Sequence, residues 1–354
     1  MVALEELLTT LVKRNGSDLH ITAGSPPRIR VNGKLLVTEY DTMTSTDTQK
    51  MVYSILDPQQ VARFEKDKEL DLSFGIEELG RFRTNVFYQR GAVGAVMRLI
   101  PTKIKTFEEL GLPRGMCEEL CALPKGLILI TGATGSGKST TLAAMIDHVN
   151  DTSPCHIITV EDPIEYVHKN KHSLVNQREV GTDTLEFKNA LRTALRQDPD
   201  VVLIGEMRDM ETTEAALTIS ETGHLTFATL HTSDCVQTIN RIIDIFPSHQ
   251  QAQIRTQLSF TLQAVFCQQL LPKADGRGRV LVAEIMLANS AVRALIRDNK
   301  VHQIYSVIQT GGKAGMKTMN QGLYELYRAG LITYDSAMEV TSDPDDLKRI
   351  MQKS

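Results

Sequence analysis

Residues 132–140 run Gly132-Ala133-Thr134-Gly135-Ser136-Gly137-Lys138-Ser139-Thr140. They fit the pattern G-x-x-x-x-G-K-[ST], in which a glycine-rich loop wraps its backbone N–H groups around a polyphosphate. The apolar run 126–131 before the motif predicts a buried parallel strand, and residues 141–149 after it predict a helix. This strand–loop–helix order is the setting that the motif requires. We therefore predict that residues 132–140 bind ATP, with Lys138 on the β- and γ-phosphates and Ser139 on Mg²⁺.

The size and composition of the chain indicate a globular protein of about two domains. It has 354 residues, of which 42% are hydrophobic and 23% are charged, and these fractions are ordinary. The first eight residues carry acidic side chains where a secretion signal needs basic ones, and no apolar run approaches membrane-spanning length. We therefore expect a cytoplasmic protein. Because the formal net charge is −4, the chain lacks the basic footprint of a nucleic-acid motor, and we expect no nucleic-acid partner.

The pattern of strands and helices divides the chain near residue 100. Residues 1–98 carry short strand-like and helical segments, which predict a small α+β domain. Residues 99–114 include Pro101 and predict a linker. In residues 115–354, strands and helices alternate to about residue 290, as a mostly parallel sheet requires, and helices follow. The predicted fold class is therefore α/β, with a smaller α+β domain at the N-terminus.

Individual elements follow from the same pattern. In the first domain we expect strands at 18–22, 28–31, 70–74, 81–88 and 94–99, and helices at 3–14, 47–56 and 58–66. Asp47 is the expected cap of the second helix. The expected helices near the C-terminus are 291–299, 301–310, 317–329 and 334–341.

Two later strands end in carboxylates. One strand is followed by Glu161-Asp-Pro-Ile-Glu165, and the next by Gly205-Glu206. Because the carboxyl ends of parallel strands line the ligand crevice, these side chains are placed to serve an ATPase site. Glu206 is the candidate that holds Mg²⁺ together with Ser139. Glu161 and Glu165 are both candidates for the base that polarises water, and reasoning from the residues does not rank them.

Two further features lie near the same edge. Arg208 and Asp209 follow the second acidic strand, and an ion pair between them competes with a functional role. A third strand lies in residues 223–234 and has a histidine at each end, with His231 on the crevice side and hydroxyl side chains beside it. His231 is therefore a candidate for contacting the γ-phosphate.

Four segments together resemble one family closely, the secretion-type hexameric ATPases. These are the phosphate loop, the two acidic strand ends and the histidine strand. That superfamily powers type II and type IV secretion and type IV pili. Residues 291–298 and 315–323 also resemble signatures of its PilT branch, which retracts type IV pili, although Val292, Ala294 and Asp298 depart from the pattern. The resemblance covers essentially the whole chain and implies a PAS-like domain over 1–98 and a RecA-like P-loop ATPase domain over 115–354.

The resemblance also implies an activity. It suggests a homohexameric ring that hydrolyses ATP with Mg²⁺ and depolymerises pili, which supports twitching motility. Such a motor acts through a platform protein of the inner membrane, is peripheral to that membrane, and reaches the pilin polymer only indirectly. The family makes Glu165 and Glu206 the leading catalytic carboxylates, and Arg83, Arg90 and Arg98 the arginines that reach an ATP site. An accessory or regulatory retraction ATPase and a RecA-like nucleic-acid motor remain alternatives.

The cysteines bear on the choice between pilus retraction and assembly. Assembly and type II secretion relatives generally carry a zinc site made of two C-x-x-C pairs after the histidine strand. Here that stretch offers only Cys235 and Cys267, neither in such a pair, so no tetrathiolate site can form within one chain. This favours retraction. Cys117 and Cys121 stand four apart on a predicted helix without further ligands, and we expect them to be buried thiols.

The helix predicted over 291–299 suggests a coupling surface. Its apolar residues recur at helical spacing and should pack on the ATPase core. Arg293 and Arg297 are four residues apart and should share the outward face, where they would grip an acidic partner or a neighbouring subunit.

Overall fold

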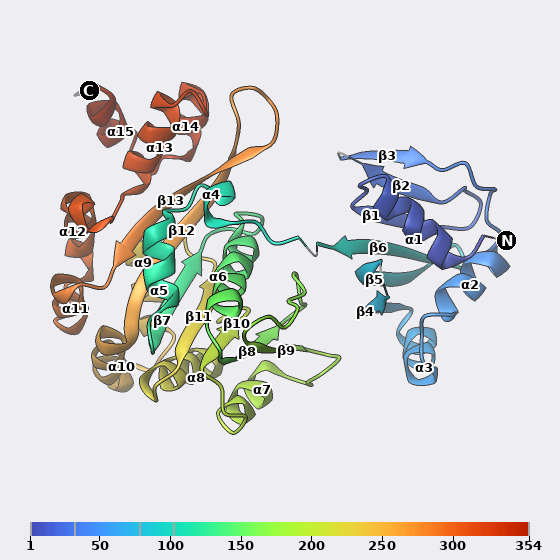
Figure 1. The fold of residues 1–354 in the computed structure, drawn as a ribbon, viewed down its shortest axis with the longest axis horizontal. Coiled ribbons are helices and arrows are strands. Elements are labelled where there is room, and N and C mark those ends of the chain that lie inside the picture. Colours follow the sequence, from blue (N-terminus) through green and yellow to red (C-terminus); the bar gives the residue numbers. More distant parts are fainter. Residues whose placement is uncertain (1, 32, 78, 102, 353–354) are drawn as a thin grey trace. The chain divides into compact units, whose positions relative to one another are not determined.

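The computed structural model describes residues 2–31, 33–77, 79–101 and 103–352. It divides the chain into two compact units, Met1–Lys103 and Ile104–Ser354, each with its own sheet and helices (Figure 1). Within the range 99–114, which we predicted to be a linker, strand β6 ends at Ile100 and helix α4 spans Phe107–Leu110. Thr102 of that range lies outside the described residues.

The first unit is a six-stranded sheet with three helices, which confirms the prediction of an α+β domain. Its strand order is β3-β2-β1-β6-β5-β4, and every neighbouring pair is antiparallel. Inward side chains such as Leu19, Phe82 and Met97 are fully buried and form one core with the apolar faces of the helices. The elements are α1 (Leu4–Lys13), β1 (Asp18–Ile21), β2 (Arg28–Val31), β3 (Lys34–Val37), α2 (Ser45–Tyr53), α3 (Pro58–Asp67), β4 (Glu69–Ile76), β5 (Gly80–Gln89) and β6 (Ala92–Ile100).

Helix α2 begins earlier than we predicted. Thr44 is its N-cap, because its hydroxyl accepts the backbone N–H of Asp47 at 3.2 Å. The Asp47 carboxylate in turn accepts the backbone N–H of Thr44 at 2.9 Å. Asp47 therefore completes a capping box from inside the helix, and the prediction that it is the cap itself is wrong.

The second unit is built on a seven-stranded sheet, which confirms the α/β prediction. Its strand order is β13-β12-β7-β11-β10-β8-β9. All neighbouring pairs are parallel except β12 and β13. The strands are β7 (Gly126–Thr131), β8 (His156–Glu161), β9 (Leu174–Glu179), β10 (Val201–Ile204), β11 (Leu225–Leu230), β12 (Leu262–Pro272) and β13 (Arg279–Leu287). Every residue of β7, β10 and β11 is buried, which explains why these strands are mostly apolar.

Helices cover both faces of this sheet. Helices α4 to α6 pack on one face in one buried cluster, and α7 to α12 pack on the other face in a second cluster. Their bounds are α5 (Arg114–Cys121), α6 (Lys138–Thr152), α7 (Phe187–Ala194), α8 (Met210–Glu221), α9 (Cys235–Asp244), α10 (Ser248–Thr261), α11 (Ser290–Arg297) and α12 (Ile304–Thr310), with short 3-10 turns at Val301–Gln303 and Gly312–Ala314. Among the helices of the described ranges, none has both the length and the apolar character needed to cross a membrane.

The C-terminal helices form a small separate core against the ends of β12 and β13. They are α13 (Met319–Arg328), α14 (Tyr334–Val340) and α15 (Pro344–Gln352), and their buried centre includes Leu323, Ala337 and Leu347. We did not predict α15.

Arg293 and Arg297 do not share one exposed face of α11, contrary to our prediction. Arg297 is exposed, but Arg293 is half-buried. The Arg293 guanidinium donates to the carbonyl oxygens of Ser259 at 2.7 Å and Phe260 at 3.0 Å, at the carboxyl end of α10. It also donates to the side chain of Gln263 at 2.9 Å. Arg293 therefore fastens α11 to the end of α10.

Candidate nucleotide-binding site

The loop at residues 132–137 joins β7 to α6 at the carboxyl edge of the parallel strands. Gly132 has φ +138°, and a Cβ there would lie 2.3 Å from the carbonyl oxygen of Gln268. Gly135 has φ +81°, and Gly137, the N-cap of α6, has φ +94°. These angles are strained for any residue with a side chain. The three glycines of the motif are therefore required by the shape of the loop.

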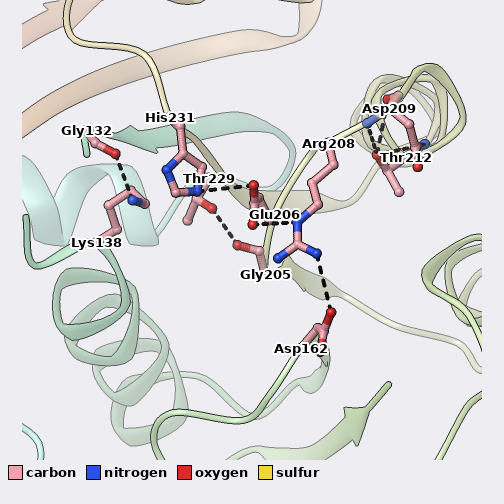
Figure 2. Close-up of polar contacts among 10 residues, drawn as sticks. All are labelled: Gly132, Lys138, Asp162, Gly205, Glu206, Arg208, Asp209, Thr212, Thr229 and His231. Atoms are coloured by element: carbon pink, nitrogen blue, oxygen red, sulfur yellow. Dashed lines mark hydrogen bonds and ion pairs between the residues drawn. The ribbon is translucent and has the colours of Figure 1, made fainter. Parts of the chain in front are cut away.

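Lys138 is the first residue of α6 and folds back over this loop (Figure 2). Its Nζ donates to the carbonyl oxygens of Gly132 at 2.7 Å and Ala133 at 3.1 Å. Burial lowers the pKa of Lys138 from its usual value, and the charges of Glu206 and Glu165 act in the opposite direction. The ammonium group thus lies inside the loop with two carboxylates near enough to affect it.

The loop fits a polyphosphate. The Ser136 hydroxyl is buried and has no hydrogen-bond partner among the described residues, so it is free to donate to an anion. The positive end of the α6 dipole lies at the same place. Ser139 is half-buried on the first turn of α6, while Thr140 pairs with the hydroxyl of Tyr166 at 2.9 Å. Ala133 and Thr134 are exposed at the tip of the loop.

The neighbouring strands β8, β10 and β11 bring three further segments to this edge. Glu206, after β10, accepts a hydrogen bond from Arg208 Nε at 2.7 Å, and its other carboxylate oxygen lies 3.1 Å from His231 Nε2. Arg208 also reaches Asp162, with Nη1 and Oδ2 3.5 Å apart. Figure 2 shows the resulting chain of contacts from His231 through Glu206 and Arg208 to Asp162. The two acidic strand ends and the histidine strand therefore meet in one polar network.

Gly205 lets β10 and β8 approach closely just before Glu206. Its N–H donates to the carbonyl oxygen of Val160 at 2.8 Å, and a Cβ on Gly205 would lie 3.2 Å from the Glu161 Cα. The Thr229 hydroxyl on β11 donates to the carbonyl oxygen of Gly205. Both adjacent strands therefore hold the backbone that presents Glu206.

The two glutamates of the acidic segment lie in different environments. Glu161 ends β8 and accepts hydrogen bonds from Thr159 Oγ1 at 2.7 Å and Gln177 Nε2 at 3.3 Å. Burial raises its pKa to about 7. Glu165 is exposed, and its charge acts on Lys138. Glu161 is therefore hydrogen-bonded to its own strand and to the neighbouring strand, whereas Glu165 is exposed and near enough to act electrostatically on Lys138.

The three predicted arginines lie in the first unit and are all exposed. Arg83 on β5 and Arg98 on β6 are directly opposite each other in the sheet register, and Arg90 has φ +51° in the turn between these strands. Arg98 Nε donates to Asp18 Oδ1 at 2.8 Å. Burial alone would raise the pKa of Asp18, but hydrogen bonds from Ser17 and Arg98 lower it. The role of these arginines at an ATP site stays a prediction.

Sequence reasoning missed the partners of Arg208. Of the two alternatives for Arg208, the ion pair with Asp209 is not observed, because Asp209 caps helix α8, and Arg208 pairs with Glu206 and Asp162 instead. The order of the strands in the sheet would have indicated the partner of Arg208. Two parallel strands that are neighbours in a sheet place their C-terminal residues side by side. Once β8 and β10 are paired, Asp162 becomes a natural partner for Arg208.

Comparison with known proteins finds similarity over both units. The family model for type II/IV secretion system proteins matches residues 2–333. The type IV pilus retraction ATPase PilT of Pseudomonas aeruginosa is 48% identical over 97% of this chain and 99% of its own length. A twitching motility protein of Neisseria gonorrhoeae is 47% identical over 94% of this chain and 89% of its own length.

A solved structure agrees with these relatives. The crystal structure of the pilus retraction motor PilT with bound ADP matches this chain with a TM-score of 0.92 and 51% identity. The match covers 99% of this chain and 100% of the other. Both units therefore match a solved structure that contains a bound nucleotide.

Proposed function

The chain belongs to the family of type II/IV secretion system proteins, and we propose that it is the ATPase motor that retracts type IV pili. Relatives named as a retraction ATPase and a twitching motility protein share nearly its whole length. The observation that carries the proposal is the polar network at the phosphate loop. Lys138, at the start of α6, folds over a loop whose backbone angles require glycine. Glu206 and His231, which follow β10 and β11, lie 3.1 Å apart, and the charge of Glu206 acts on Lys138.

The residues at this edge of the sheet have different roles in ATP hydrolysis. The loop N–H groups and Lys138 bind the phosphates of ATP, and Ser139 and Glu206 hold Mg²⁺. When bound, Mg²⁺ neutralises charge that develops on the phosphates. Glu165 orients and polarises the attacking water. Arg208 and His231 hold the Glu206 side chain in place. His231 also contacts the γ-phosphate.

Mechanical work requires more than one subunit. We extend the proposal to a homohexameric ring in which Arg83, Arg90 and Arg98 stabilise the transferring phosphoryl group. The ring acts on a platform protein in the inner membrane, at the inner face of that membrane, and so reaches the pilin polymer indirectly. Conformational change coupled to ATP binding and hydrolysis would drive the motion.

Glu206→Gln tests the proposal, because it keeps the shape of the side chain and removes its charge. We expect nucleotide still to bind and ATP turnover to fall by at least about 10²-fold, the low end for acid–base and metal-positioning groups. In cells that lack the chain, the unchanged gene should restore pilus retraction and the Glu206→Gln copy should not. Glu214→Gln, on the exposed side of α8, is the control and should restore retraction.

Two outcomes would contradict the proposal. Normal turnover by Glu206→Gln would remove Glu206 from the chemistry. Nucleotide binding by the unchanged protein without measurable turnover would instead favour an accessory or regulatory role beside another retraction motor.

A further inference from the structure

Three buried side chains meet beside the phosphate-loop strand, namely Cys235, Cys267 and Glu284. The two cysteines are fully buried and Glu284 is 3% exposed. The two sulfur atoms and a carboxylate oxygen all lie within 4.8 Å of one another, and the sulfur atoms are 3.6 Å apart. None of these residues belongs to the nucleotide site described above.

The sheet register explains how distant parts of the sequence converge here. Cys267 on β12 is directly opposite Thr131 of β7 on one side and Glu284 of β13 on the other. Residues opposite each other in a sheet point to the same face. Cys235 begins α9, which packs on that face, and its backbone N–H donates to Glu284 Oε1 at 2.9 Å. Cysteines that are far apart in sequence are therefore neighbours in the fold.

We propose that Cys235, Cys267 and Glu284 form a binding site for one thiophilic divalent cation of the Zn²⁺ class. Two thiolates on a tetrahedral Zn²⁺ at about 2.3 Å each lie about 3.8 Å apart, which is close to the separation observed. A disulfide needs the sulfur atoms at about 2.05 Å, so the arrangement suits a shared cation better than a bond. On binding, each thiol gives its proton to solvent, both sulfurs and one carboxylate oxygen donate electron pairs to the cation, and no electrons are transferred.

The surroundings can stabilise the charge of such a site. The Thr131 hydroxyl donates to Cys267 Sγ at 3.0 Å, and the Thr238 hydroxyl lies 3.8 Å from the same sulfur. Hydrogen bonds of this kind orient metal ligands and tune their affinity. The N-terminus of α9, at Cys235, adds the positive end of a helix dipole.

A bound cation would join α9 to β12 and β13, which carry its three ligands. Thr131 directly precedes Gly132, the first residue of the phosphate loop, and its hydroxyl donates to Cys267. Cys235 follows the segment that contains His231. The cation site would therefore adjoin the nucleotide site without sharing a residue with it. It differs from a tetrathiolate zinc site, because it uses two cysteines that are not in C-x-x-C pairs and a carboxylate.

Cobalt titration of the full-length chain tests this site independently of pilus retraction. The protein is reduced, freed of metal with a chelator and titrated with Co²⁺ without oxygen. We expect near-ultraviolet absorption from thiolate–cobalt charge transfer that saturates at one Co²⁺ per chain and is displaced by Zn²⁺. Glu284→Gln should weaken Co²⁺ binding by about 10-fold or more, and Cys235→Ala with Cys267→Ala should abolish the absorption.

Cys117 and Cys121 supply a matched control. They are also buried, but they lie outside the cluster of metal-ligand atoms, so Cys117→Ala with Cys121→Ala should bind Co²⁺ normally. Thermal unfolding and ADP binding show whether each variant is folded. If the Cys235 and Cys267 double variant is not folded, the Co²⁺ affinity of Glu284→Gln tests the proposal instead. That variant should remain folded, because glutamine can still accept the hydrogen bond from the backbone N–H of Cys235. The proposal is overturned if the unchanged protein shows no charge-transfer band, or if the band survives in a folded double variant. It is also overturned if Glu284→Gln binds Co²⁺ with unchanged affinity. A thiol assay of the metal-free protein that finds two fewer reactive thiols would overturn it as well.

Discussion

Glu161 ends β8 and Glu165 follows four residues later, and the two carboxylates have different surroundings. Glu161 is held by Thr159 and Gln177 and is partly withdrawn from solvent. Glu165 is exposed and acts electrostatically on Lys138. A base that activates water must be free to approach the phosphate and must be charged. At the scale of single residues, the structure therefore supports Glu165.

Exchanging each glutamate for glutamine tests this assignment. Glu165→Gln should retain ATP binding and lower turnover by at least about 10²-fold, as expected when a positioned base is removed. Glu161→Gln should retain most of the turnover, because the amide still accepts the Thr159 hydrogen bond. Steady-state phosphate release, with nucleotide binding measured in parallel, gives both values. The reverse order of effects would assign the base to Glu161.

The environment of Glu161 also predicts how stability depends on pH. Its pKa rises from 4.5 to about 7 on burial, so between these values the folded state binds more protons than the unfolded state. The free energy of unfolding should therefore fall as pH rises through this window. We expect Glu161→Gln to unfold at higher urea concentration than the unchanged protein at pH 8, by about 1–2 kcal/mol after allowing for partial solvent access.

The same comparison at pH 5 provides the control for this prediction. There Glu161 is protonated in the folded state, so its replacement by glutamine should change the free energy of unfolding little. An equal effect of the substitution at pH 5 and pH 8 would show that charge burial at Glu161 is not the cause.

Motif spacing predicted most of this site, and pairing between strands supplied the rest. The loop, Lys138 and Glu206 follow from local sequence, because each lies at a strand end that an apolar run identifies. The interactions of Arg208 with Asp162 and of Cys235 with Cys267 span 46 and 32 residues. They depend on which strands become neighbours and on register, which a single sequence does not state.

At the scale of elements, a side chain of α11 supplies hydrogen bonds to backbone carbonyl groups at the end of α10. The last carbonyl groups of a helix have no partner within it. Arg293 on α11 donates to two of these groups on α10 and to Gln263 beyond it. This contact joins two helices that cover the same face of the sheet, so we assign Arg293 to the stability of the fold.

Arg293→Ala should therefore destabilise the protein. Loss of the charge-assisted hydrogen bonds that the half-buried Arg293 donates to these carbonyl groups should cost about 1–3 kcal/mol, measured by urea unfolding of the second unit. Arg297→Ala, on the exposed side of the same helix, should change stability by less than about 0.5 kcal/mol. A larger loss in Arg297→Ala than in Arg293→Ala would refute this assignment and restore Arg297 as the structural residue.

Two elements that sequence reasoning missed differ in the signal that they offered. All four residues of β3 are exposed, so no alternation of apolar and polar residues marks that strand. Helix α15 carries its apolar residues at helical spacing, so a signal was present there and was overlooked. By contrast, β7 and β10 are covered on both faces, and their apolar runs predicted them without help from the fold.

At the scale of the whole molecule, the two units keep separate cores. The cluster that contains Leu19, Phe82 and Met97 lies within the first unit, and the remaining clusters lie within the second. Each unit therefore has the buried contacts needed to fold by itself. The phosphate loop, Glu206 and His231 all belong to the second unit, whereas the predicted arginines all belong to the first.

This division leads to a prediction for the second unit alone. Residues 104–354 should unfold cooperatively and bind ADP as the full-length chain does, because the loop and its network are complete there. ATP turnover should nevertheless fall by at least about 10-fold, since arginine contacts to the transferring phosphoryl group are worth about 10³–10⁵ in other nucleotide hydrolases.

In the full-length chain, Arg83→Ala should lower turnover without affecting the Asp18–Arg98 ion pair. Arg63→Ala, an exposed arginine on α3, is the control and should hydrolyse ATP normally. Full turnover by residues 104–354 would remove the first unit from the chemistry, and failure of that fragment to bind ADP would show that the site needs both units to form.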